Sequence, residues 1–245
     1  MRLTTNEGLS QSHVNAILKD RKGFMWFGTD EGLNRYDGYA FTTYKHNPEK
    51  AESLLNDVVV ALFEDDAGNL WVGTASGLDR FDRSTDSFVH YGQETSAPLV
   101  KAIFQDSKGK LWLATSNGLY SFHVAGDALV RHLDQDQDAS RPSHSIYQIA
   151  EDNEGALWLA TERGLIRFNP QTRQFIRYTH DPTNHKSIGA NHVRTVYKDR
   201  RGNVWIGTVG AGIARFNRRD NSFTHFRHDP RDGNSLSHND IFAMT

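Results

Sequence analysis

The chain has 245 residues, and its 28 basic and 30 acidic side chains nearly cancel, so it lacks the positive excess that is typical of nucleic-acid-binding proteins. Its hydrophobic content of 37% is enough for a sizeable core, no apolar run approaches the length of a membrane span, and the first residues, MRLTTNEGLS, lack the apolar stretch of a signal peptide. The absence of cysteine excludes disulfide bonds and thiolate metal sites.

A pattern that recurs five times dominates the sequence. Aspartate stands six residues before each tryptophan, glycine three before and threonine three after, without exception. The tryptophans, 41 to 47 residues apart, are Trp26, Trp71, Trp112, Trp158 and Trp205. The glycines are Gly23, Gly68, Gly109, Gly155 and Gly202. Agreement in three columns indicates one supersecondary unit that is repeated five times.

Each repeat begins with a short predicted strand that is rich in β-branched and aromatic residues. These strands cover residues 14–18, 59–63, 100–104, 146–150 and 193–197. An Asp-x-x-Gly segment follows, which predicts a tight hairpin turn because Asp accepts a backbone N–H and Gly adopts a positive φ. A calcium loop is the alternative, but Lys and Arg often stand between the Asp and the Gly, and no acidic ligand recurs.

The second predicted strand of each repeat carries the tryptophan, and both chain neighbours of that residue are apolar, as in Met25-Trp26-Phe27. Because successive strand residues face opposite sides, both faces of this strand are predicted to be buried. Gly or Ala two residues later shares the tryptophan face, and we expect it to leave room for a bulky neighbour. A third and a fourth strand follow, for example over residues 32–37 and 40–46.

Four short antiparallel strands that bury both faces against similar neighbours predict a blade of a β-propeller. We therefore expect an all-β fold in which residues 1–245 form a single β-propeller of four-stranded antiparallel blades, with five complete repeats plus the start of a sixth, as part of a larger ring. The units cover about residues 8–52, 53–97, 98–143, 144–186 and 187–234, with a partial unit at 235–245. The isolated chain is expected to form either a strained five-blade ring or an open arc whose unpaired edge strands associate into a homo-oligomer.

The repeated motif, Asp-x-x-Gly-x-apolar-Trp-apolar-Gly/Ala-Thr-x-x-Gly-Leu/Ile-x-x-Phe/Tyr, resembles the two-component regulator propeller repeat from about Gly8 to Thr245. The segments GLSQSHVNAI and SLSHNDIFAM are similar to the start of a blade in that family. The resemblance implies a non-enzymatic periplasmic or extracytoplasmic sensor module of a bacterial histidine kinase, hybrid two-component regulator or diguanylate cyclase. It implies a small ligand, by analogy a glycan, no cofactor, and a signalling output domain on sequence outside this chain.

A binding site is expected at positions that differ between repeats, because the constant positions serve each blade. The position eleven residues before each tryptophan, early in the innermost strand and near the predicted channel, holds Asn15, Val60, Lys101, Tyr147 and Arg194. The loops between the second and third strands share a face with the linkers between repeats and hold Asp30, Glu31, Ser76, Ser116, Asn117, Glu162 and Arg163. Lys101, Tyr147 and Arg194 are candidates for gripping an anion or a sugar. The alternative is that they only line a wet channel.

The twelve histidines lack the helical pairing of a zinc site, and we expect His180, His185, His225 and His228 to be solvated loop residues. The twice-occurring His-Asp-Pro at 180–182 and 228–230 is interpreted as turn chemistry. No catalytic or metal-binding residue is predicted. Two alternatives to a sensor stay open: a protein-interaction scaffold in the manner of WD repeats, and a lyase that resembles the virginiamycin B lyase group, which needs a histidine and an acid together near the channel.

Overall fold

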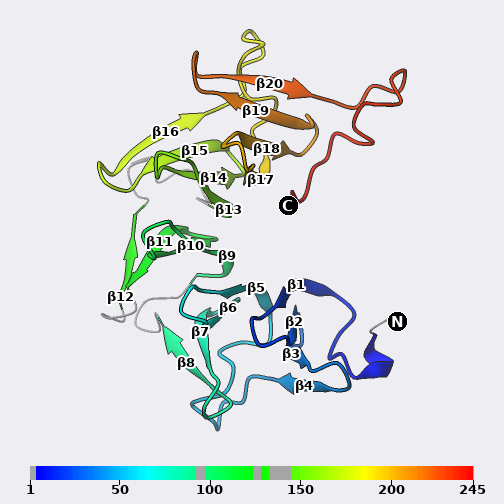
Figure 1. Ribbon diagram of the computed structural model, residues 1–245, viewed down its shortest axis with the longest axis vertical. Helices are drawn as coiled ribbons and strands as arrows, with labels where there is room; N and C mark the ends of the chain where they lie inside the picture. Colours follow the sequence, from blue (N-terminus) through cyan, green and yellow to red (C-terminus); the bar gives the residue numbers. More distant parts are fainter. Residues whose placement is uncertain (1–3, 92–97, 124–127, 133–144, 245) are drawn as a thin grey trace. The chain divides into compact units, whose positions relative to one another are not determined.

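The computed structural model describes residues 4–91, 98–123, 128–132 and 145–244 (Figure 1). These residues form five four-stranded antiparallel sheets and the short 3-10 helix η1 (Thr5–Glu7). The chain divides into a first compact unit, Met1–Arg131, and a second, His132–Thr245. The prediction of an all-β fold built from four-stranded blades is confirmed.

Three sheets belong to the first unit, and in each of them every strand pairs with the next along the chain. The first sheet contains β1 (Val14–Lys19), β2 (Met25–Thr29), β3 (Gly32–Tyr36) and β4 (Phe41–Tyr44). The second contains β5 (Val59–Glu64), β6 (Leu70–Thr74), β7 (Gly77–Asp82) and β8 (Ser87–Tyr91). The third contains β9 (Val100–Gln105), β10 (Leu111–Thr115), β11 (Gly118–His123) and β12 (Ala128–Arg131).

Two sheets of the same topology form the second unit. The fourth sheet contains β13 (Ile146–Glu151), β14 (Leu157–Thr161), β15 (Gly164–Asn169) and β16 (Gln174–Tyr178). The fifth contains β17 (Val193–Lys198), β18 (Val204–Thr208), β19 (Ile213–Asn217) and β20 (Ser222–Phe226). All five predicted first strands are present and run one residue further than the sequence pattern indicated.

The constant residues of the repeat form one hydrogen-bonded group in every sheet. In the first sheet, Oδ1 of Asp20 accepts the backbone N–H groups of Lys22 and Phe24 at 3.0 and 2.9 Å, which closes the turn. Its Oδ2 accepts the indole N–H of Trp26 at 2.9 Å, and the same bond recurs in the other four sheets at 2.8 to 3.0 Å. Gly23 adopts a φ of 94°, and the four equivalent glycines also have positive φ, so the turn prediction is confirmed.

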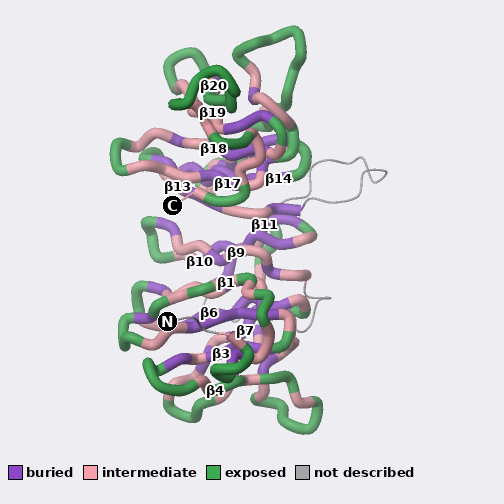
Figure 2. The backbone as a smooth tube through the Cα atoms, turned by 90° about the vertical axis from the view of Figure 1, so that its right-hand side faces the viewer, coloured by how far each residue is buried: buried purple, intermediate pink, exposed green. Residues whose placement is uncertain are grey.

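Within each unit the core lies between consecutive sheets, where Trp26, Trp71 and Trp158 each pack against a phenylalanine of the next sheet. The ring centroids of Trp26 and Phe81 are 5.0 Å apart in the first unit, and those of Trp158 and Phe216 are 4.6 Å apart in the second. Figure 2 shows buried residues along the strands and exposed residues in the turns. Aromatic pairs at these distances add to the free energy of burial, so the sheets are held face to face.

Small residues on the tryptophan face allow the next sheet to approach closely. A Cβ added at Gly28 would lie 2.6 Å from Cγ1 of Val59, and one added at Gly73 would lie 2.9 Å from Cγ1 of Val100. Val59 and Val100 begin the first strands of the following sheets. The expectation that Gly or Ala leaves room for a bulky neighbour is therefore confirmed at these positions.

The prediction that every tryptophan is buried on both faces is wrong for the last one. Trp26, Trp71, Trp112 and Trp158 are 0% exposed, whereas Trp205 is only partly buried. No sheet follows the fifth among the described residues, so part of the Trp205 face has no partner. Ile241 covers some of it, because its Cγ2 lies 2.7 Å from the place of a Cβ at Gly207 and its N–H donates to the carbonyl of Thr208 at 3.0 Å.

Three segments that each follow the fourth strand of a sheet share one conformation: the linkers 46–57 and 180–191, and residues 228–239 after the fifth sheet. In each, Nδ1 of the first histidine bonds a backbone carbonyl eight residues later, at 2.8 Å for His46, 2.9 Å for His180 and 2.6 Å for His228. The backbone N–H of the same histidine donates to the Oδ1 atom eleven residues later. The interpretation of His-Asp-Pro as turn chemistry is confirmed, but His180 and His228 are structural residues and not merely solvated ones.

Candidate functional site

The loops between the second and third strands and the linkers lie on the same face within each unit. The backbone N–H of Gly32 donates to the carbonyl of Asp57 at 2.7 Å, which joins the β2–β3 loop to the linker 46–57. In the second unit, Gly164 donates in the same way to Asn191 at 2.6 Å. The predicted site residues therefore lie on this loop face of their own unit.

Each first strand contains a β-bulge, and the bulged residue is the variable position eleven residues before the tryptophan. The pairing skips one residue in every sheet, between Val14 and Ala16 in β1 and at the same place in β5, β9, β13 and β17. The skipped residues are Asn15, Val60, Lys101, Tyr147 and Arg194. A bulge takes a residue out of the regular ladder and redirects its side chain, which is why bulges are frequent beside functional sites.

In the first unit, the bulged Asn15 contacts the predicted loop residue Asp30. Nδ2 of Asn15 donates to Oδ1 of Asp30 at 2.8 Å and to the carbonyl of Val59 at 3.1 Å. Nδ1 of His13 lies 2.8 Å from the other oxygen of the same carboxylate. Hydrogen bonds from His13 and then Asn15 hold the pKa of Asp30 below its usual range, so this carboxylate is ionised at neutral pH.

In the second unit, three predicted residues come together. The hydroxyl of Tyr147 donates to Oε1 of Glu162 at 2.5 Å, and the guanidinium of Arg194 lies 4.4 Å from the centroid of the Tyr147 ring. The imidazole ring of His192 is 5.7 Å from the same ring. We call these four residues, Tyr147, Glu162, His192 and Arg194, the Tyr147 cluster.

The charges in the Tyr147 cluster suit recognition of a polar ligand. Burial first and the Glu162 carboxylate second raise the pKa of Tyr147 to about 12, so its hydroxyl remains a neutral donor. No described carboxylate lies within ion-pair distance of Arg194, so the aromatic ring, and not an anion, positions its guanidinium. The cluster therefore offers guanidinium donors and carboxylate acceptors next to an aromatic ring.

Asn117, Glu31 and Arg163 form hydrogen bonds within their own sheet. The guanidinium of Arg131 donates to Oδ1 of Asn117 at 2.8 Å, and Nζ of Lys45 donates to Glu31 at 3.4 Å. The backbone N–H of Arg163 donates to Oγ1 of Thr161, which closes the loop. Lys101 is the bulged residue of β9 in the first unit, so its convergence with Tyr147 and Arg194 of the second unit remains a prediction.

Two histidines of the loop face were not predicted. His13 and His192 both stand thirteen residues before a tryptophan. Aligning the five repeats at this position would have identified both histidines from the sequence. Within the described ranges, no group of three or more His, Cys, Asp or Glu residues could hold a metal ion. No helix of the described chain is long and apolar enough to cross a membrane.

Comparison with known proteins places the repeats in one family. The profile described as two component regulator propeller matches residues 8–31, 53–76, 96–117, 140–163 and 187–210, once in each repeat. A stretch of 51 residues is 47% identical to a histidine kinase of Formosa agariphila, and it makes up 21% of this chain and 4% of that kinase.

Solved structures agree with this assignment. The extracellular domain of a hybrid two component system from B. thetaiotaomicron is 28% identical with a TM-score of 0.78, over 93% of this chain and 32% of that chain. This chain thus spans about a third of that domain. A virginiamycin B lyase from Staphylococcus aureus is 15% identical with a TM-score of 0.63, over 86% of this chain and 68% of that chain, a likeness that shows the fold alone.

The resemblance that the sequence indicated is confirmed. The family profile, the Formosa histidine kinase and the extracellular domain from B. thetaiotaomicron all belong to two-component signalling. The chain belongs to the two component regulator propeller family.

Proposed function

We propose that this chain is part of the extracytoplasmic sensor of a bacterial signalling protein of the two-component type, and that it acts by binding a ligand and not by catalysis. The five family matches and the likeness to the extracellular domain of a hybrid two component system support this proposal. The output domain, a histidine kinase in the Formosa relative, would lie on other sequence of the same protein.

The loop face is the proposed ligand-binding surface, with the Tyr147 cluster as its best-defined part. The observation that carries this proposal is the bulge, because it recurs at the same place in all five sheets while the bulged residue differs in each of them. A scaffold whose repeated bulge presents a different side chain in each sheet can acquire recognition without loss of the fold.

The chemistry of the Tyr147 cluster fits a polyhydroxylated ligand such as a glycan. Sugar hydroxyls both donate and accept hydrogen bonds, and the cluster presents Glu162 as an acceptor beside Arg194 as a donor. Aromatic rings contact the apolar faces of sugars, and Tyr147 supplies such a ring. Binding would be moderate in affinity, because these groups are partly exposed.

A panel of neutral and acidic oligosaccharides, probed with the 245-residue chain, tests the proposal. We expect at least one to bind saturably. The Arg194→Ala variant should weaken its affinity about tenfold or more, since a hydrogen bond to a charged group contributes about 1.5–3 kcal/mol. Arg200→Ala, an exposed charge change in the β17–β18 turn, is the matched control and should leave the affinity unchanged. Binding that survives Arg194→Ala and Tyr147→Phe would exclude the Tyr147 cluster as the site.

A further inference from the structure

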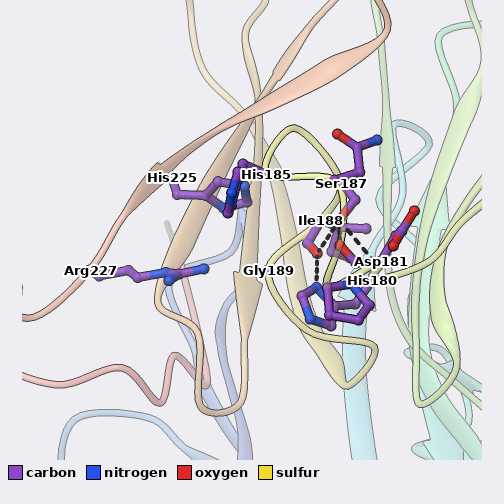
Figure 3. Close-up of a pocket in the computed structure, with 10 residues that line it drawn as sticks. His180, Asp181, His185, Ser187, Ile188, Gly189, His225 and Arg227 are labelled. Carbon is purple, nitrogen blue, oxygen red and sulfur yellow. Dashed lines mark hydrogen bonds between the residues drawn. The ribbon is translucent and has the colours of Figure 1, made fainter.

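A pocket that is separate from the Tyr147 cluster opens in the second unit between β20 and the linker 180–191 (Figure 3). Its volume is about 340 Å³, which is within the range of small-molecule sites. Its lining includes His180, His185, Gly189, His225 and Arg227. None of these residues belongs to the Tyr147 cluster.

In the second sheet, which belongs to the first unit, an aspartate carboxylate lies between the fourth strand and the linker, at the place that corresponds to this pocket. There His90 of β8 pairs across the ladder with Asp79 of β7, and its Nδ1 lies 2.6 Å from the fully buried Asp79 carboxylate. The other oxygen of Asp79 accepts the backbone N–H of Leu55 in the linker 46–57 at 2.8 Å. One carboxylate thus satisfies an imidazole and a linker N–H together.

The second unit keeps both donors but lacks the carboxylate. His225 of β20 occupies the place of His90, and its cross-strand partner is Ala214 instead of an aspartate. Nδ1 of His225 is buried, and it has no hydrogen-bond partner among the described residues. The linker residue equivalent to Leu55 is Gly189, and no described group accepts its N–H. A buried polar atom without a partner is costly, and a ligand could satisfy it.

The pocket reaches His225 because residue 189 has no side chain. A Cβ at Gly189 would lie 3.4 Å from Nδ1 of His225 and 2.9 Å from Cβ of Ala211. Figure 3 shows Arg227 extending toward the part of the linker that carries Gly189. The only carboxylate that lines the pocket, Asp181, is already engaged, since Thr183 donates to it through both its backbone N–H and its hydroxyl.

We propose that the pocket between β20 and the linker 180–191 binds a small carboxylate, whose charged group takes the place that the Asp79 carboxylate holds in the first unit. Nδ1 of His225 and the N–H of Gly189 donate to it, and the Arg227 guanidinium supplies the opposite charge. The remaining volume accommodates a body of the size of a uronic acid. This site is independent of the ligand proposed for the loop face.

Binding is expected to depend on pH. Burial first, together with the nearby guanidinium of Arg227 and imidazole of His180, holds the pKa of His225 below its ordinary value in the free protein, while the carbonyls of Ser187 and His185 act against this. Donation from Nδ1 to a carboxylate favours the protonated ring, so binding takes up a proton. Affinity therefore rises as the pH falls from about 8 to about 6.

Glucuronate and its neutral isostere glucuronamide, titrated separately into the 245-residue chain, form the test. Calorimetry measures affinity, and histidine side-chain NMR signals report the site. We expect glucuronate to bind saturably, to shift the His225 signals, and to bind at least about tenfold more tightly than glucuronamide. Equal binding of the two compounds, no saturable binding of glucuronate, or binding only with added zinc would overturn the proposal.

Ala214→Asp is the most informative variant, because it introduces beside His225 the carboxylate that Asp79 supplies beside His90 in the second sheet. It should fold, raise the pKa of His225 and weaken glucuronate binding about tenfold or more. His225→Phe should lose binding equally, and Arg177→Gln, at the equivalent place on β16, is the matched control. A folded Ala214→Asp protein that still binds glucuronate contradicts the assignment. If that variant is unstable, unchanged affinity in the exposed Arg227→Gln variant contradicts it instead.

Discussion

At the scale of single residues, the constant aspartate does more than end a turn. Asp20, for example, accepts two backbone N–H groups and the indole N–H of the tryptophan six residues later, so that turn and core are fixed by one carboxylate. In the second sheet both residues are buried, since Asp65 is 3% and Trp71 is 0% exposed. This coupling explains why the two columns of the repeat never vary separately.

Replacement of Asp65 by alanine should therefore be strongly destabilising. The change leaves the buried indole N–H of Trp71 without an acceptor, which costs about 1–3 kcal/mol, and the backbone N–H of Asn69 also loses its bond. Urea unfolding measures the difference. Asp199→Ala is the matched control in the fifth sheet, where Trp205 is partly exposed, and it should cost less. Equal losses in the two variants would argue against the buried bond as the cause.

The pair of Asp79 and His90 predicts a pH-dependent stability. The hydrogen bond to Asp79 raises the pKa of His90 above its ordinary value of 6.5, and the carbonyl of Ala51 accepts from the other ring nitrogen at 2.6 Å. A raised folded-state pKa adds stability that is complete below the unfolded pKa of about 6.5 and is lost as the pH rises through the folded value.

Urea midpoints of the wild-type chain should thus fall as the pH rises from about 6.5 toward about 9, and His90→Gln should flatten this slope. His238→Gln changes an exposed histidine and is expected to leave the slope as it is. A His90→Gln protein with the same pH profile as the wild type would show that the pair carries no such linkage.

At the scale of elements, the spacing between the sheets of the first unit is set by the small residue two positions after Trp26 and Trp71. The first strand of the next sheet lies against it, as Val100 lies against Gly73. Polar contacts reinforce the same junctions: Arg83 of the second sheet forms an ion pair at 2.8 Å with the fully buried carboxylate of Asp20 in the first. The second unit repeats this arrangement with Arg218 and Asp152, whose atoms are 3.5 Å apart.

Gly73→Ala tests the close approach of the second and third sheets. Its Cβ would meet the carbonyl oxygen and Cγ1 of Val100 at 2.9 Å each, and overpacking of this kind typically costs about 1–3 kcal/mol. Thermal or urea unfolding gives the value. Gly233→Ala, with open space around its Cβ, should change stability by less than about 0.5 kcal/mol. A neutral Gly73→Ala would mean that the sheets separate without cost.

At the scale of the whole molecule, the sequence alone predicted the repeat, its strands and its family, because five copies act as an alignment of the chain with itself. Position eleven before the tryptophan was also identified as variable, but its bulge was not, since a register shift depends on pairing between strands. The unpartnered Nδ1 of His225 depends on the linker residue Gly189, which lies far from His225 in the chain. Such contacts leave no periodic signal.

Hydrogen–deuterium exchange on the 245-residue chain, with and without an oligosaccharide that it binds, tests the central claim that the loop face is the sensing surface. We expect ligand-induced protection at the starts of β13 and β17 and in the β14–β15 loop, around Tyr147, Glu162 and Arg194. Protection confined to the Asp-x-x-Gly turns at the other ends of these strands, with no change at the bulges, would contradict it.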